Sequence, residues 1–131
     1  MIIRTGLENG NEGKSIAWAL DFPGCYAAGR DAGEALMRLP HALAAYADRI
    51  QQRAASPWLE LGNFDVRLTE VWDVSTINDR YEPANEGYAV NAWFKHDWLP
   101  LAHADVEHGL EMLRWARADL LELVSELTPE E

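Results

Sequence analysis

Apolar and polar residues alternate along the first part of the chain, a pattern that predicts β-strands. The alternation covers Met1–Leu7 and Ser15–Phe22. The run 8–13 between them is rich in Asn and Gly, residues that tolerate the positive φ angles of tight turns. Small residues at Cys25–Gly29 fit a third, short strand, and Phe64–Val74 alternates again. We therefore expect three strands close together in sequence and a fourth one further along.

Between the third and fourth strands the apolar period lengthens to three and four residues, which is typical of an amphipathic helix. Asp31 and Glu34 have capping-box spacing at its start, with Asp in the position that Ser or Thr usually holds. Pro40 lies inside the pattern and is expected to kink or split the helix. The order βββαβ predicts an α+β fold over residues 1–74. The apolar face consists of Leu36, Leu39, Leu43, Tyr46, Ala47 and Ile50.

Residues 75–101 have no clear period but are rich in aromatic side chains, and so aromatic a segment is rarely a mobile loop. Tyr88–Phe94 is compatible with a short extra strand; otherwise these rings pack as an arm against the domain or a second chain. Trp93 and Trp98 are interface candidates, because tryptophan is enriched at binding hot spots. We expect 75–101 to be an acidic, aromatic connecting arm.

The segment 102–131 is expected to be a long amphipathic helix from about His103 to Leu127, since its apolar residues are alternately four and three positions apart. Arg117 interrupts this apolar seam once. An exposed seam of this length favours pairing with identical helices, in a homodimer or a higher homo-oligomer. The interface candidates on the seam are Val106, Leu110, Leu113, Leu120 and Val124.

Charge is distributed unevenly along the chain. The 131 residues include 11 Lys and Arg and 22 Asp and Glu, a net charge of −11. Residues 1–54 hold six basic and six acidic residues, so the remainder carries the whole excess. Such a field repels phosphate, which argues against direct nucleic-acid binding, but it suits a basic protein partner. The acidic part is therefore the expected interaction surface.

The cysteine count and the hydropathy pattern bear on the compartment. A single cysteine, Cys25, cannot form an internal disulfide, which favours a reducing environment. No apolar stretch approaches the length of a membrane span, and no secretory signal is visible. We expect a cytoplasmic protein with no membrane association.

The sequence offers no converging set of catalytic or metal-binding residues. Cys25 has no activating base nearby and is expected to be a small buried residue. Asp21 is expected to fix the Pro-Gly turn that follows it through backbone N–H groups. His103 and His108 lie on different sides of the predicted helix and cannot share a metal, and His41 is expected on an exposed helix side. No catalytic residue, metal site or cofactor is predicted.

The motif Asp21-Phe22-Pro23-Gly24-Cys25 is followed by Gly29 and by a helix that opens with Asp31 and Glu34-Ala35-Leu36. This pattern resembles the HicB-like antitoxin family over about residues 1–74. The resemblance implies a βββαβ sheet-and-helix domain, a partial ribonuclease-H-like or double-stranded-RNA-binding-domain-like arrangement. It does not imply ribonuclease-H activity.

The end of the chain resembles a different structure. Thr128-Pro129 followed by two acidic residues is either a polar tail that closes the previous helix or the start of a further helix. Together with Leu99-Pro100-Leu101 and Arg114-x-x-Arg117-Ala118-Asp119-Leu120-Leu121, it is similar to the join between a HicB-like domain and a DinB-like helical bundle. This resemblance implies that the last helix would be the first helix of a metal-binding bundle.

Two functional hypotheses follow from these resemblances. The first is a non-catalytic HicB-like binding or regulatory module that self-associates and binds a protein partner, in the antitoxin case a small basic ribonuclease toxin. Such antitoxins usually carry a DNA-binding tail, whereas residues 102–131 hold two basic and eight acidic residues. The alternative is the N-terminal module of a DinB-like metal-dependent protein, separated from its bundle.

Overall fold

The computed structural model describes residues 1–130 and divides into two compact units, Met1–Trp98 and Leu99–Glu131. The first unit is a mixed α+β domain, which contains a four-stranded sheet, a small second sheet and one long helix. The second unit contains the other helix. The segment 75–98 therefore belongs to the same compact unit as the βββαβ elements.

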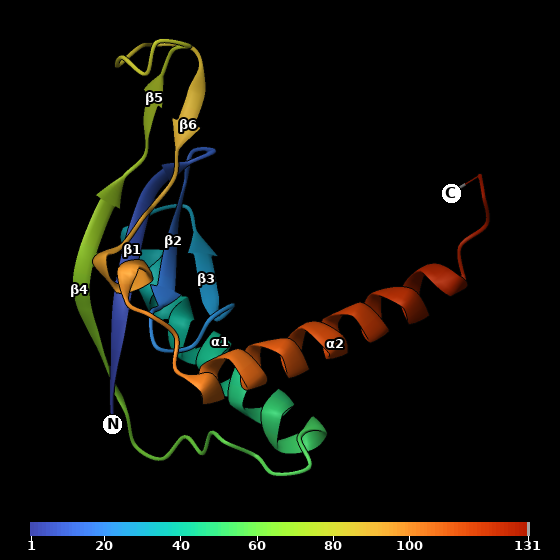
Figure 1. Cartoon of the computed structure of the whole chain (residues 1–131). Helices are drawn as coiled ribbons and strands as arrows, with labels where there is room; N and C mark the ends of the chain where they lie inside the picture. Colours follow the sequence, from blue (N-terminus) through green and yellow to red (C-terminus); the bar gives the residue numbers. More distant parts are fainter. Residues whose placement is uncertain (131) are drawn as a thin grey trace. The chain divides into compact units, whose positions relative to one another are not determined.

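The four-stranded sheet has the order β3-β2-β1-β4, in which the first three strands are antiparallel neighbours and β4 runs parallel to β1 (Figure 1). The long helix between β3 and β4 is the crossover that a parallel pair requires. The structure confirms the order βββαβ that the apolar periods predict. The strands are β1 (Ile2–Asn11), β2 (Lys14–Ala19), β3 (Tyr26–Gly29) and β4 (Asp65–Asp73).

The turn between β1 and β2 is shorter than the predicted run 8–13. β1 continues to Asn11, so only Glu12 and Gly13 lie between the strands, and both have positive φ angles, 51° and 77°. Two-residue hairpins favour such angles because they match the twist of the strands. Gly10, with φ of 82°, lies at an irregularity in the β1–β2 pairing. The Asn and Gly residues thus serve a bulge as well as the turn.

α1 (Ala32–Arg53) packs on one face of the sheet and supplies much of the core. Its predicted apolar face is confirmed: Leu39, Leu43 and Ile50 are fully buried, whereas His41 is exposed, as expected. Of the kink or split expected at Pro40, the split is wrong, because α1 is one helix from end to end. Proline removes one backbone hydrogen bond of the helix. Burial of the apolar side chains on either side of Pro40 offsets this loss of stability.

Asp31 is the N-cap of α1, and its Oδ1 accepts a hydrogen bond from the backbone N–H of Glu34 at 2.9 Å. In a complete capping box, the Glu34 carboxylate would also accept a hydrogen bond from the backbone N–H of Asp31. Instead, Glu34 Oε2 accepts the backbone N–H of Arg30 at 2.7 Å and also pairs with the guanidinium of Arg30. Glu34 therefore ties the helix to the end of β3 rather than to its own cap.

The segment after β4 folds back on itself. β5 (Ser75–Ile77) and β6 (Tyr88–Val90) form a two-stranded antiparallel sheet that projects beyond the larger sheet (Figure 1). A short 3₁₀ helix, η1 (Lys95–Trp98), follows. The predicted extra strand within Tyr88–Phe94 exists, but only its first three residues are in the strand.

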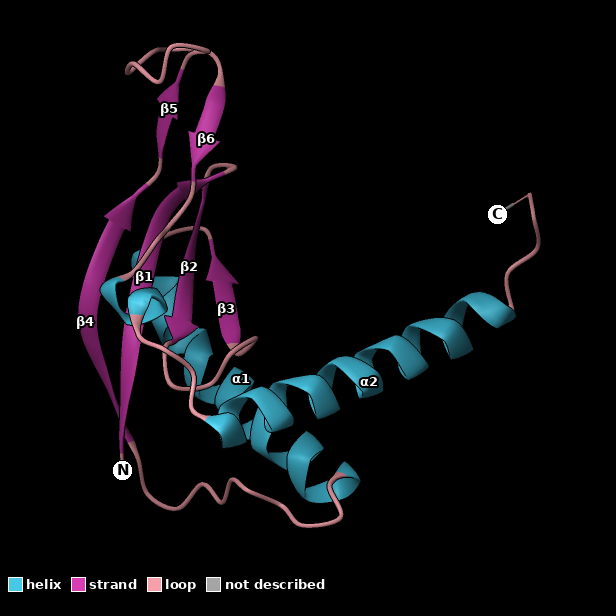
Figure 2. Cartoon of the chain, in the orientation of Figure 1, coloured by secondary structure: helices cyan, strands magenta, loops and turns pink. Residues whose placement is uncertain are grey.

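α2 (His103–Ser125) forms the second unit and is a single uninterrupted helix (Figure 2). Its start at His103 agrees with the prediction, and its end falls two residues before the predicted Leu127. The Asp105 carboxylate accepts the backbone N–H of Ala102 at 3.1 Å and so satisfies one free donor at the helix start. Thr128, Pro129 and Glu130 are not helical, and Glu131 lies outside the described residues.

Candidate functional site

Backbone hydrogen bonds and one side-chain hydrogen bond hold the Pro-Gly turn of the Asp21–Cys25 motif, since the Tyr46 hydroxyl donates to the carbonyl of Pro23 at 3.1 Å. The N–H of Phe22 donates to the carbonyl of Ala19 at 3.0 Å, and the N–H of Cys25 donates to the carbonyl of Phe22 at 2.9 Å. Gly24, after Pro23, has φ of 83°, which favours glycine. The expectation that Asp21 fixes this turn is wrong, because its carboxylate accepts hydrogen bonds from a different strand.

Asp21 binds Arg4 of β1. The Nε of Arg4 lies 3.2 Å from both carboxylate oxygens, Nη2 makes a close ion pair with Oδ1, and the Arg4 backbone N–H donates to Oδ2. Burial raises the pKa of Asp21, but the hydrogen bonds and charge of Arg4, with a smaller contribution from His96, outweigh it and leave that pKa below its ordinary value. The motif carboxylate is therefore an ionised structural partner of Arg4.

Cys25, the last residue of the motif, lies in the core between the sheet and α1 and is only 3% exposed. Burial raises the pKa of its thiol to about 11. Because the thiolate is the reactive form, a thiol with this pKa is almost entirely protonated near neutral pH. The sequence prediction of a small buried residue is confirmed.

The chain between β6 and the end of η1 crosses the face of the sheet opposite α1, and it forms a candidate binding surface there. We call residues 91–98 the docked arm. The Glu8 carboxylate accepts the backbone N–H of Ala92, and Glu70 Oε2 accepts the backbone N–H of Lys95 at 2.8 Å. Two carboxylates on adjacent strands thus hold this irregular segment by its backbone.

Phe94 anchors the docked arm. Its side chain is 5% exposed, and its ring lies so close to Gly6 of β1 that an added Cβ there would be 2.7 Å from Cζ. Sequence reasoning missed this contact and the roles of Glu8 and Glu70. A glycine inside a strand is a sign of close approach, so Gly6 was the available signal, but it does not identify the partner.

Two tryptophans of the docked arm form an exposed aromatic surface. The rings of Trp93 and Trp98 are stacked, with centroids 4.6 Å apart and an angle of 15° between their planes. Their exposed fractions are 60% and 68%. These residues, singled out from sequence, are thus brought together, and we call them the tryptophan pair.

A second aromatic contact lies on the sheet. Trp18 of β2 and Tyr26 of β3 face one another with ring centroids 4.9 Å apart.

Within residues 1–130, the buried atoms Trp18 Nε1 and His96 Nδ1 have no hydrogen-bond partner. Both residues belong to the first unit, and the charge of His96 acts on Asp21.

The apolar seam predicted for the last helix exists on α2 and is solvent-exposed in the single chain. Elsewhere on α2, His103 Nε2 lies 3.2 Å from the Glu107 carboxylate. The interface candidates of the seam have exposed fractions from 42% to 67%, in the set Val106, Leu110, Leu113, Leu120 and Val124.

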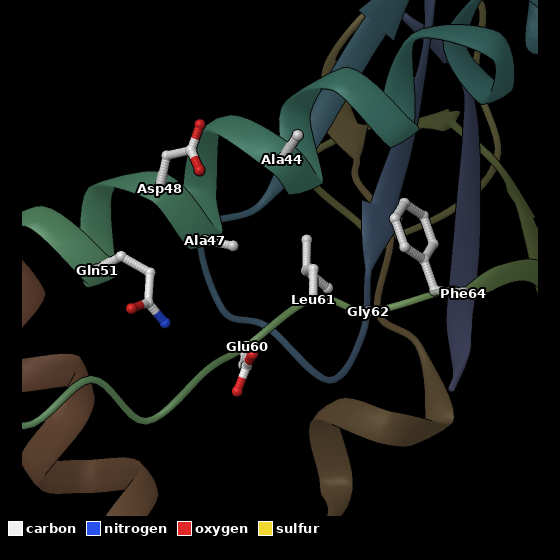
Figure 3. Close-up of a pocket in the computed structure, with 8 residues that line it drawn as sticks. All are labelled: Ala44, Ala47, Asp48, Gln51, Glu60, Leu61, Gly62 and Phe64. Carbon is white, nitrogen blue, oxygen red and sulfur yellow. The ribbon is translucent and has the colours of Figure 1, made fainter.

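A shallow groove with a volume of about 350 Å³ lies between α1 and the segment before β4 (Figure 3). Ala47 and Leu61 point toward one another in it, whereas the carboxylates of Asp48 and Glu60 point away. Gln51 bridges the two walls by donating to the carbonyl of Leu59 at 2.7 Å. No set of polar groups converges there, so the groove suggests no chemistry.

Residues 1–130 contain no group of three or more His, Cys, Asp and Glu side chains that could hold a metal ion. In the same range, no helix combines the length and the apolar character that a membrane crossing demands.

No family model, curated protein or solved structure matches this chain. The resemblance to the HicB-like family therefore depends on the motif from Asp21 to Cys25, on Gly29 and on the helix that follows.

Proposed function

We propose that this chain is a non-catalytic HicB-like binding module that recognises a protein partner through the tryptophan pair. The observation that carries the proposal is the exposure of Trp93 and Trp98, stacked on a segment that is itself fixed to the sheet. Large exposed aromatic side chains in monomeric proteins commonly mark binding surfaces, and tryptophan dominates interface hot spots.

The support of the docked arm makes this surface suitable for binding. A flexible aromatic segment would lose conformational entropy when it binds, which weakens affinity. Here the backbone of the arm is already held by Glu8 and Glu70, and Phe94 is buried against Gly6. The tryptophan pair is therefore presented in a defined geometry before any partner arrives.

The chemistry of the motif supports a binding role over a catalytic one. Asp21 is engaged by Arg4, and Cys25 is buried with a pKa of about 11. A general base or nucleophile must reach a substrate in its reactive protonation state, and neither group meets both conditions near neutral pH.

The partner we favour is a small basic protein, and in the antitoxin case a ribonuclease toxin. Residues 55–131 carry the whole net charge of −11, so a basic surface would be attracted to this part of the chain. The same field disfavours nucleic acid as a direct ligand.

The test is a comparison of tagged wild-type chain with Trp93→Ala and Trp98→Ala in capture from the native host, followed by titration of the recovered protein by calorimetry. We expect a small basic protein whose affinity falls at least tenfold in each variant, the cost of losing a hot-spot residue. The matched control is Tyr81→Ala, an aromatic side chain that is 84% exposed outside the docked arm. Equal binding by all variants would refute the role of the tryptophan pair.

We also propose that the chain self-associates through α2, since the seam from Val106 to Val124 is exposed. Identical helices bury such a stripe in a closed dimer. The variant Leu113→Gln with Leu120→Gln should shift the chain toward monomer in sedimentation equilibrium at micromolar concentration. The control Ala118→Gln lies outside the seam. A wild-type monomer at these concentrations would contradict this proposal.

A further inference from the structure

The outer edge of β4 is a second surface with the features of a protein interface. β4 is the terminal strand of the sheet and spans Asp65–Asp73, and within the described first unit it pairs with β1 alone (Figure 1). Leu68 and Val71 on this strand are 44% and 56% exposed. An edge strand of this length presents unpaired backbone groups that another strand can bond.

The register of β4 against β1 shows which of its side chains share a face. Val66 pairs with Ile3 and Val71 with Leu7, and both of these β1 residues lie in the core beneath α1. In a regular strand, residues separated by an odd number of positions lie on opposite faces. The irregularity between Thr5 and Gly6 adds one residue to β4 and returns Val71 to the face of Val66.

The same irregularity places Arg67 and Glu70 together on the opposite face. Arg67 pairs with Arg4 and Glu70 with Gly6, and Gly6 lies beneath Phe94 of the docked arm. Arg67 is exposed and forms no ion pair within residues 1–130. One oxygen of the Glu70 carboxylate accepts the N–H of Lys95. An unpaired cation and an anion thus occupy the same face of one edge strand.

We infer that β4 pairs antiparallel with β4 of a second copy of this chain, with Arg67 opposite Glu70 and Val66 opposite Val71. Residues that lie directly opposite one another in an antiparallel pair share a face of the sheet. Because of the irregularity in β4, Val66 and Val71 share one face and Arg67 and Glu70 share the other, so both pairs meet this condition. A two-fold axis repeats each contact, so two ion pairs and two valine pairs form. The pairing joins two four-stranded sheets into one continuous sheet.

Sliding the register by two residues makes a poorer interface. It places Leu68 opposite Val71, but it separates Arg67 from Glu70 and sets Val66 against Asp73. Charged edges often protect a strand from pairing, and they do so when like charges meet. The charges of β4 are instead complementary to those of an identical strand in the proposed register.

A cross-linking experiment on the full chain tests the register directly. Val66→Cys chain and Val71→Cys chain are oxidised separately and as a mixture, then separated on a non-reducing gel. The proposed pairing brings the two new thiols opposite one another only in the mixture, because Val66 is distant from its own symmetry mate. Native Cys25 is buried and does not interfere. A covalent dimer in the mixture alone supports the proposal; none, or equal amounts in all samples, overturns it.

Charge reversal tests the energetic part of the inference. Arg67→Glu should weaken the dimer about tenfold in sedimentation equilibrium, because two attractive cross-strand pairs become repulsive. Arg67→Lys keeps the charge and should retain affinity to within about threefold of wild type. Arg80→Glu makes the same change of charge away from β4 and should have no effect. No loss of affinity in Arg67→Glu, or an equal loss in Arg67→Lys with native circular dichroism, would refute the pairing of Arg67 with Glu70.

This inference is independent of self-association through α2. The α2 variant Leu113→Gln with Leu120→Gln should leave the cross-link between positions 66 and 71 unchanged. If that variant abolishes the cross-link, β4 does not pair by itself and the inference is wrong, whereas the proposal for α2 stands.

Discussion

The ring of Phe94 lies directly over the backbone of Gly6, and a Cβ added to this glycine would be 2.7–2.8 Å from three ring atoms. Real Cβ contacts are essentially never so short, so any larger residue at position 6 must displace the ring. The contact joins the first strand to a segment near the end of the first unit. Together with the hydrogen bonds to Glu8 and Glu70, this contact holds the docked arm on the sheet and so supports the geometry of the tryptophan pair.

The first prediction concerns this contact. Gly6→Ala should lower the free energy of unfolding by about 1–3 kcal/mol, the usual cost of forcing an extra methyl group into a packed site. In a Phe94→Ala background the same change should cost under about 0.5 kcal/mol, because the obstructing ring is gone. Urea unfolding of the four chains gives the double-mutant cycle. Equal costs in both backgrounds would show that the ring does not constrain position 6.

The ion pair between Asp21 and Arg4 gives a pH dependence. The folded-state pKa of Asp21 lies below its ordinary value, so the pair stabilises the fold above about pH 4 and this contribution is lost as the pH falls through the folded-state pKa. Asp21→Asn should therefore be less stable than wild type at pH 7, by a small amount because the side chains are partly exposed. The difference should shrink as acid is added.

Urea titrations between pH 2 and pH 7 measure this prediction. The control is Asp79→Asn, a carboxylate in the loop between β5 and β6 that takes part in no ion pair among residues 1–130. A stability difference for Asp21→Asn that stays constant down to pH 2 would mean that the carboxylate has no preferred charge state in the fold.

Gly29 ends the motif that resembles the HicB-like family, and steric contact with α1 explains why this position needs a glycine. A Cβ at Gly29 would be 2.4 Å from the backbone nitrogen of Ala35 and 2.8 Å from the backbone carbon of Glu34, so β3 could not approach the first turn of α1. We expect Gly29→Ala to lower the free energy of unfolding by at least about 2 kcal/mol, because backbone must move.

Gly62→Ala is the matched control for Gly29→Ala. It has no atom within 4 Å of its added Cβ and no positive φ, so it should change stability by under about 1 kcal/mol, in either direction. Thermal unfolding of both variants by circular dichroism compares them. A mild effect at Gly29 would mean that β3 and α1 can separate without loss.

The sequence was sufficient for the order βββαβ and for the last helix, because helix and strand periods and the Asp31 cap are local signals. It did not predict β5 or η1, which lie in a stretch without a clear period. The apolar face of α1 followed from spacing alone, and Leu39, Leu43 and Ile50 are buried as that spacing predicts. The split expected as one outcome at Pro40 does not occur, since packing of the helix against the sheet overrides the local preference of proline.

The candidate site was predictable only in part, because it depends on contacts between distant residues. Trp93 and Trp98 were found from their chemistry, but Ala92 and the Glu8 carboxylate that holds it are 84 residues apart. Alternation in β4 predicts a strand without telling which strand it pairs with. Asp21 was assigned to its local turn, whereas its partner Arg4 lies 17 residues earlier, on the neighbouring strand.

Cys25 provides the last prediction, on thiol reactivity. With a pKa of about 11, roughly one thiol in a thousand is ionised at pH 8, and burial removes most access to the sulfur. A disulfide reagent at pH 8 should therefore react with the native chain at least about a hundredfold more slowly than with the urea-unfolded chain. Val71→Cys adds a thiol where the side chain is 56% exposed and serves as the positive control in the same fold.

Because the thiolate is the attacking species, the rate at which Cys25 reacts in the native chain should still rise with pH up to about 11. Rapid stoichiometric labelling of the native wild type at pH 8 would place Cys25 at an accessible surface, and the argument for a structural role would then fail.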